Sequence, residues 1–233
     1  MKFSAYPVVD LTVGGETLHF EQDNGSMYVG TSVWPSSLVL VKWVEHVFEK
    51  GLSSVCEGLS PATFAGKKGV DLGTGVGVAG MGLALMGLNC LLTDISPVMP
   101  ALKRNFKKNL GSTSLGSAGK AGVKTGKVKV AQLYWGNVKQ IEALKPPFDY
   151  VIAGDVVYLE NIVQPLLETM SALAGPETVI ILGYQIRQAE AHEMFWRLCP
   201  EYFTVVKVPR EELHPEYCWP ENEVYVLKKK CRV

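Results

Sequence analysis

The sequence predicts an α/β protein with an open, mostly parallel sheet of seven strands and helices on both faces. From residue 69 onward, short apolar segments alternate with amphipathic segments of helical period, and strands separated by helices run parallel. Five candidate strands belong to this alternation: 69–73, 90–94, 127–135, 149–155 and 178–184. Two later segments, 203–209 and 223–229, are joined by a loop rich in proline, glutamate and aromatic residues, so we expect an antiparallel pair.

The helices predicted between these strands carry apolar residues at helical spacing. They cover residues 78–88, 97–109, 138–144, 161–174 and 188–198. The segment 161–174 shows the pattern most clearly, with one apolar face made by Ile162, Val163, Leu166, Leu167, Met170 and Leu173. Such a face is typical of a helix that packs on a sheet.

The region before this alternation predicts a hairpin followed by a helix. Residues 8–22 alternate apolar and polar side chains around Gly14 and Gly15, which is a hairpin pattern. Residues 35–51 have apolar residues at helical spacing, and proline at the start and glycine at the end suit the two helix termini.

We expect one domain over residues 1–233, with an extension at 1–50 and a core at 51–233. We expect residues 52–68 to form a connector that contains a few possible helical segments. Residues 111–127 consist of glycine, serine, threonine, alanine and lysine with few larger apolar side chains, so we expect a mobile surface loop there.

Charge and cysteine usage restrict the classes of partner. Lys and Arg total 23, as do Asp and Glu, and this balance argues against nucleic acid or an anionic membrane surface as the partner. The five cysteines are odd in number and never spaced C-x-x-C, which favours a reducing compartment. The sequence predicts neither a secretory signal nor a membrane span. We expect a cytoplasmic protein, with the nucleus as an alternative.

The stretch VDLGTGVGVAG, residues 70–80, supports two interpretations. Gly75, Gly77 and Gly80 form G-x-G-x-x-G, the dinucleotide fingerprint. Alternatively, Asp71 precedes a G-x-G-x-G loop that begins at Gly73, the usual loop for S-adenosylmethionine, and Gly80 then serves helix packing. In both cases the missing side chains let the backbone approach a ligand closely.

Further polar and aromatic residues follow the next strands, where ligands bind in open parallel sheets. Asp94 ends the second strand and suits the ribose hydroxyls of an adenosine, or the cap of the following helix. Trp135 follows the third strand and suits either an adenine face or the core. Asp155 and Tyr158 follow the fourth strand, where substrate would meet cofactor; the alternatives are a turn cap and a half-buried aromatic. Nucleophile and metal motifs are absent from the sequence, so no metal is expected.

With the glycine loop, Asp94, Trp135 and the D-V-V-Y motif at 155–158 in this order, the chain resembles the Rossmann-like, seven-strand S-adenosylmethionine methyltransferases. Within that class it resembles methyltransferase family 16, the protein-lysine methyltransferases. The stretches that carry this resemblance are GTSVWPSSLVLVKWVE at 30–45, FDYVIAGDVVYLENIVQPLLETM at 148–170 and ILGYQIRQAEAHEMFW at 181–196.

The resemblance implies a role for each matching residue. Asp155 and Tyr158 are the implied catalytic residues, with Tyr158 and Tyr184 as walls of a lysine channel. Asp71 is the implied partner of the methionine end of the cofactor, and Trp34 would close over the cofactor. The other implied cofactor contacts are Gly73, Thr74, Gly75, Gly77, Asp94, Trp135 and Gly154.

The implied reaction is methyl transfer to a neutral lysine of a non-histone protein, such as a chaperone or an AAA ATPase, by a monomeric enzyme. Asp155 would orient the amine or receive a proton through water. The alternatives are a small-molecule or nucleic-acid methyltransferase, a nicotinamide oxidoreductase, and a binding module without activity. D-V-V-Y differs from the [DN]-P-P-[YF] motif of base methylation, and an oxidoreductase leaves Trp34, Trp135 and the D-x-x-Y pair without a role.

Overall fold

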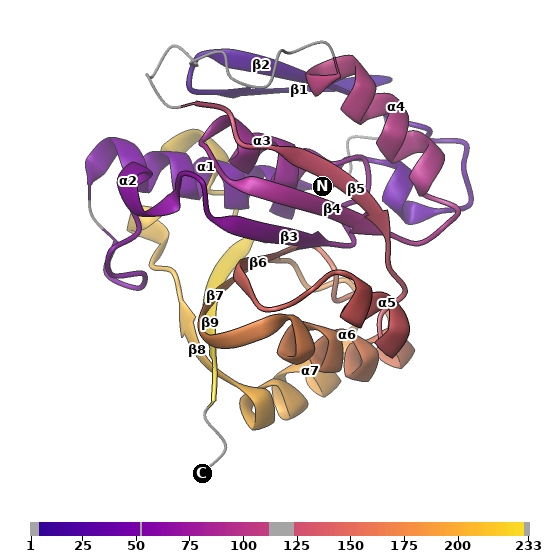
Figure 1. Cartoon of the computed structure of the whole chain (residues 1–233), viewed down its shortest axis with the longest axis vertical. Coiled ribbons are helices and arrows are strands. Elements are labelled where there is room, and N and C mark those ends of the chain that lie inside the picture. Colours follow the sequence, from indigo (N-terminus) through magenta and orange to yellow (C-terminus); the bar gives the residue numbers. More distant parts are fainter. Residues whose placement is uncertain (1–4, 52, 112–123, 231–233) are drawn as a thin grey trace.

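The computed structural model describes residues 5–51, 53–111 and 124–230 (Figure 1). Most of the loop expected at 111–127 lies outside the described residues. The central sheet has seven strands in the order β5-β4-β3-β6-β7-β9-β8. Its members are β3 (Lys68–Leu72), β4 (Asn89–Asp94), β5 (Val128–Gln132), β6 (Phe148–Gly154), β7 (Ala174–Tyr184), β8 (Phe203–Lys207) and β9 (Glu223–Lys229).

The sheet confirms the predicted parallel alternation and the antiparallel pair at the end of the chain. Strands β3, β4, β5, β6 and β7 pair in parallel, and β9 runs antiparallel to both β7 and β8. The last strand therefore inserts between its two predecessors. The order reverses at β3, which is flanked by β4 and β6, and this switch point is where open α/β sheets bind ligands.

Helices cover both faces of the sheet, as predicted. They are α1 (Pro35–Lys50), α2 (Pro61–Phe64), α3 (Val78–Leu85), α4 (Met99–Leu110), α5 (Val138–Ala143), α6 (Glu160–Leu173) and α7 (Ala189–Tyr202). Figure 1 shows α5, α6 and α7 on one side of the sheet and α1 and α3 on the other. Side chains alternate between the two core layers along each strand: Tyr150 and Ile152 join the α1 side, whereas Val151 and Ala153 join the α6 side.

The N-terminal hairpin forms as predicted and extends the α1 side of the core. Its strands β1 (Val8–Val13) and β2 (Glu16–Glu21) are joined through Gly14 and Gly15, whose φ angles are 58° and 83°. Two positive φ angles match the hairpin turn that follows the natural strand twist. Every second residue of β1 is buried, and β2 contacts α4 through the amide of Asn105, which binds both backbone groups of Glu21.

Several predicted boundaries differ from the structure for local reasons. The third helix ends at Leu85, because Gly87 adopts a φ of 102° that turns the chain toward β4. Strand β5 ends at Gln132, so Leu133 to Trp135 leave the sheet. In the part of the chain that is described, no helix is long and apolar enough to cross a membrane.

Candidate active site

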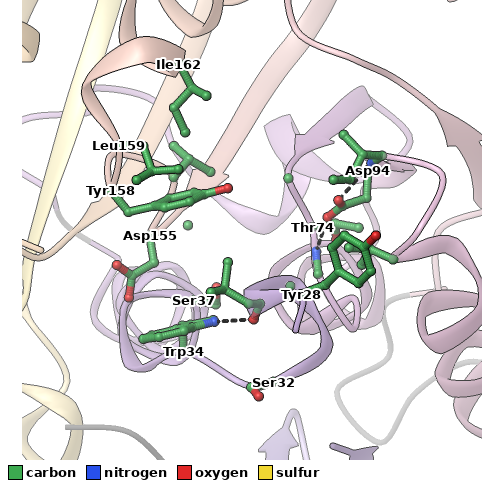
Figure 2. A pocket seen from close by; sticks show the side chains of 18 of the residues that line it. Tyr28, Ser32, Trp34, Ser37, Thr74, Asp94, Asp155, Tyr158, Leu159 and Ile162 are labelled. Atoms are coloured by element: carbon green, nitrogen blue, oxygen red, sulfur yellow. Dashed lines mark hydrogen bonds between the residues drawn. The ribbon is translucent and has the colours of Figure 1, made fainter. Parts of the chain in front are cut away.

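A cavity of about 590 Å³ opens at the carboxyl ends of β3 to β7, beside the switch point (Figure 2). Its volume lies in the range that small-molecule and cofactor sites use. Nine of the residues predicted from the sequence line it: Trp34, Gly73, Thr74, Gly75, Asp94, Trp135, Gly154, Asp155 and Tyr158. The fold therefore brings residues from the ends of four strands and from the start of α1 into one site.

The glycine loop lies on the wall of this cavity in a conformation that favours glycine. Gly73 and Gly75 have φ angles of 60° and 61°. A Cβ atom on Gly73 would lie 2.9 Å from the Trp135 ring, and one on Gly75 would lie 2.9 Å from the carbonyl oxygen of Gly30. Both positions therefore need glycine for backbone conformation and for space.

Asp71 and Gly77 do not line the cavity, in contrast to the other residues predicted to contact the cofactor. Asp71 is buried beneath the loop, where one carboxylate oxygen accepts hydrogen bonds from the Thr74 hydroxyl and from the Gly80 N–H at 2.8 Å. Gly77 caps α3 and faces the Met81 side chain. Asp71 lies behind the loop because side chains alternate along β3 and its carboxylate points toward α3.

Gly80 serves helix packing, as the S-adenosylmethionine interpretation of the loop predicts. A Cβ atom there would lie 2.1 Å from the Leu92 side chain and 3.0 Å from the Asp71 carboxylate. The close approach of α3 to the sheet therefore needs a glycine, and no nucleotide is required to explain it.

Burial raises the pKa of Asp71 to about 7, because desolvation outweighs the hydrogen bonds from Thr74 and Gly80. The unfolded carboxyl keeps its ordinary value near 3.8, so between about pH 4 and pH 7 the folded chain binds more protons than the unfolded chain. The contribution of Asp71 to the free energy of unfolding therefore falls as pH rises through this window.

We expect Asp71→Asn to remove this loss of stability, because the amide carries no charge at any pH. The variant should gain stability relative to the native protein as pH rises from 5 to 7, and the difference should level off above pH 7. Urea unfolding at pH 5, 6, 7 and 8 measures it, with exposed Asp23→Asn as the matched control. A difference that is the same at every pH would contradict the assignment.

Asp94 ends β4 with its carboxylate bound to the glycine loop. Its two oxygens accept hydrogen bonds from the N–H groups of Gly75 and Ile95, both at 2.8 Å. It does not cap the following helix, which begins with Val98 as its N-cap, so the capping alternative is wrong. Burial raises the pKa of Asp94 to about 6 against the effect of these two N–H groups. A carboxylate can accept more than two hydrogen bonds. Asp94 lines the cavity, so it can accept further hydrogen bonds from a bound ligand.

Asp155 directly follows β6, the fourth parallel strand, and forms an ion pair that the sequence did not predict. Its carboxylate accepts a two-pronged hydrogen bond from Arg187, with Nε at 2.8 Å from Oδ1, and a further hydrogen bond from the Ser36 hydroxyl at 3.0 Å. Arg187 follows β7 as Asp155 follows β6, so a charged residue just past an apolar strand was the available signal. Ser36 carried no such signal.

Tyr158 lies on the cavity wall, whereas Tyr184 does not. In Figure 2 the Tyr158 ring extends into the cavity between Leu159 and Trp34. Burial raises the pKa of the Tyr158 hydroxyl, so it stays protonated at neutral pH. The prediction of Tyr184 as a second channel wall is wrong. Its ring is buried in an aromatic cluster, and its hydroxyl lies 2.6 Å from His192 Nδ1.

The segment before α1 also contributes to the cavity, and only Trp34 of it was predicted. The Trp34 indole N–H donates to the Val29 carbonyl at 2.8 Å. Met27, Tyr28 and Val29 are exposed at the same cavity. In Figure 2, Tyr28 faces Asp94 and Trp34 lies at the Asp155 end. Among the described residues, no group of three or more His, Cys, Asp and Glu side chains could hold a metal ion.

A seven-strand sheet with its last strand reversed, and a glycine loop bonded to an acid at the end of the next strand, define the class of S-adenosylmethionine-dependent methyltransferases. A family model described as lysine methyltransferase matches residues 13–200. The chain belongs to this lysine methyltransferase family, which confirms the resemblance seen in the sequence and removes the nicotinamide alternative.

Individual relatives agree with this family. The chain is 27% identical over 227 residues to protein N-lysine methyltransferase METTL21A of Mus musculus, covering 97% of this chain and 88% of that protein. It is 28% identical over 200 residues to EEF1A lysine methyltransferase 3 of Xenopus tropicalis, covering 85% and 77%. In fold it is similar to the T. thermophilus 16S rRNA N2 G1207 methyltransferase, with a TM-score of 0.62 and 17% identity, covering 96% of this chain and 50% of that one.

Proposed function

We propose that this lysine methyltransferase binds S-adenosylmethionine along the cavity from Asp94 to Asp155 and methylates a lysine of a protein at the Asp155 end. The observation that carries this proposal is the position of Asp94. Its carboxylate is bonded to the glycine loop and also faces the cavity. The cofactor and the substrate then meet where β6 ends, at Asp155 and Tyr158.

The residues present fit the cofactor. Asp94 supplies acceptors for the two ribose hydroxyls, and the indole of Trp135 supplies a flat surface for the adenine. Gly73 and Gly75 let the backbone approach the ligand, and Asp71 holds their loop from behind through Thr74 and Gly80. When bound, S-adenosylmethionine supplies a methyl group made electrophilic by its sulfonium.

The chain's own residues prepare the amine. A lysine has an ordinary pKa near 10.4 and must lose its proton before it can accept a methyl group. Tyr158, Leu159 and Ile162 wall the cavity with apolar and aromatic surface, and desolvation between them favours the neutral amine. The C–S bond breaks as the N–C bond forms, and the proton lost by the amine passes to water. Holding these atoms in line supplies much of the rate.

Asp155 orients the amine in this proposal and does not serve as the base. Its carboxylate already accepts from Arg187 and Ser36, and a proton on it would break the ion pair with Arg187. One lone pair remains for a hydrogen bond from the substrate. The alternative in which Asp155 receives the proton is therefore the weaker one.

A protein substrate is supported by the surface around the cavity mouth. Exposed apolar side chains gather there, namely Met27, Tyr28, Val29, Tyr134 and Leu159. Exposed apolar patches of this kind mark protein interaction sites, and the balanced net charge gives no general attraction for nucleic acid. We propose a chaperone, an AAA ATPase or an elongation factor as the substrate, and a monomeric enzyme in the cytoplasm or nucleus.

Transfer of labelled methyl groups into cell extract tests this function. The purified enzyme is incubated with extract and [methyl-³H]-S-adenosylmethionine, and the macromolecular label is then challenged with protease or nuclease. We expect label that protease releases and nuclease does not. Label that only nuclease releases would overturn the choice of a protein substrate.

A further inference from the structure

Asp155 is held in an unfavourable backbone conformation. Its φ is 62°, and among the described non-glycine residues only Lys145 shares a positive φ. Such a conformation persists only where the surroundings enforce it. The Asp155 N–H donates to the Gly183 carbonyl at 2.8 Å, which ties the end of β6 to β7. The side chain of Asp155 makes further contacts that restrain it.

The Arg187 guanidinium supplies this restraint through a fork. Its Nε and Nη2 each donate to a different oxygen of the Asp155 carboxylate. The Arg187 side chain is 18% exposed, and the Asp155 side chain is 2% exposed. A two-pronged pair fixes orientation as well as distance, which a single contact does not. The pair therefore aims the carboxylate in one direction.

A second contact ties this pair to α1 and β9. The Ser36 hydroxyl donates to Asp155 Oδ2 at 3.0 Å and accepts from the Asn222 side-chain amide at 2.8 Å. Ser36 and Asn222 are both buried. The first turn of α1 thus contacts the carboxylate directly, and the segment before β9 supports this contact through Ser36.

The Arg187 guanidinium also contacts Trp34. The guanidinium carbon lies 4.5 Å from the centroid of the Trp34 ring, which is cation–π distance. Trp34 in turn bonds the Val29 carbonyl at 2.8 Å, so the contact continues into the segment that lines the cavity. Figure 2 shows Trp34 and Asp155 at the same end of the cavity.

We propose that Arg187 is a positioning residue that holds Asp155 and Trp34 as one unit, so that the segment 28–34 stays closed over the cofactor only while the Asp155 carboxylate is correctly aimed. This inference rests on the proposed function for the contact of Trp34 with S-adenosylmethionine. Arg187 acts through these two residues. Closure at the cofactor and orientation at the substrate are then coupled, and loss of Arg187 must affect both.

Amide hydrogen exchange of the unliganded protein tests the first half of this coupling. The N–H groups of Thr31 and Ser32 bond within the segment, to Tyr28 and Val29. We expect Arg187→Met to speed exchange at these amides at least tenfold and to leave the core of β4 unchanged. Arg197→Met, on the exposed surface of α7, is the matched control. Equal exchange at residues 28–34 in native protein and Arg187→Met would overturn the proposal.

A double-variant cycle on cofactor affinity tests the second half. We expect Arg187→Met and Trp34→Leu each to weaken S-adenosylmethionine binding about tenfold by calorimetry, and the double variant to be little weaker than either. Losses that multiply to about a hundredfold, or no loss in Arg187→Met, would overturn the coupling.

Arg187→Lys repeats both measurements with the charge retained. A lysine cannot both form the fork and stack on the indole, so we expect smaller changes in the same direction. If Arg187→Met does not fold, the same two measurements on Arg187→Lys test the proposal. Losses of cofactor affinity that multiply in the cycle of Arg187→Lys with Trp34→Leu would contradict the proposal. Amide exchange in Arg187→Lys equal to that of the native protein would also contradict it. Native protein that does not bind S-adenosylmethionine would overturn the proposed function; native binding with independent losses would overturn only the role of Arg187.

Discussion

Asp155→Ala is expected to lower the rate of methyl transfer at saturating cofactor and protein substrate by about 100-fold, which is roughly 2.7 kcal/mol of transition-state stabilisation. The variant removes the carboxylate that we propose orients the incoming amine, and it leaves Arg187 without its ionic partner. Initial rates with labelled cofactor measure the effect. Cofactor affinity should fall much less, because Asp94 and the glycine loop remain.

Two further variants separate chemistry from folding in this prediction. A partly buried arginine that loses its ionic partner destabilises the fold, so thermal unfolding must be measured together with the rates. Asp155→Asn tolerates the positive φ and fills the same volume without the charge, and we expect most of the rate loss to persist in it. Asp149→Ala, at the opposite end of β6 and partly exposed, should retain full activity. Native turnover in Asp155→Asn would contradict the role of the carboxylate.

Asp94→Ala is expected to weaken S-adenosylmethionine binding by about 100-fold. Two hydrogen bonds to a charged acceptor contribute about 1.5 kcal/mol each at the low end, and about 3 kcal/mol corresponds to roughly a hundredfold change in affinity. The loss also frees the N–H of Gly75, so the glycine loop loses its anchor. Isothermal titration of native protein and variant measures the change directly.

The transfer rate at saturating cofactor separates Asp94 from Asp155. We expect Asp94→Ala to approach native turnover once the cofactor concentration is raised, whereas Asp155→Ala stays slow at every concentration. Asp149→Ala serves again as the control, because it removes an aspartate that does not line the cavity. Cofactor affinity in Asp94→Ala equal to the native value would contradict the assignment of the ribose site.

Local sequence patterns predict most of the fold. The hairpin at Gly14 and Gly15, the helix that begins at Pro35 and the alternation from residue 69 all follow from spacing within a few residues. The place of β9 between β7 and β8 could not be predicted in this way. Neighbouring strands in a sheet are chosen by tertiary packing, and the pattern of apolar residues is the same in either order.

The candidate site, too, could be predicted only where it follows from local sequence patterns. Asp94 ends β4, and Trp135 and Asp155 follow the ends of β5 and β6. A general rule about the carboxyl ends of parallel strands therefore located all three. Ser36 lies 119 residues from Asp155 in the sequence, and its contact depends on how α1 crosses the sheet. Asp71 has the expected sequence position, but its direction depends on the alternation of β3, and its side chain faces α3 instead of the cavity.

We propose that the group methylated is a lysine side chain of a protein. The most direct measurement is acid hydrolysis of the protein labelled by native enzyme and [methyl-³H]-S-adenosylmethionine, followed by separation of the amino acids. We expect label in methylated lysine, and almost none when Asp155→Ala replaces the native enzyme. Label in another methylated amino acid, or label that is lost from the protein fraction, would contradict it.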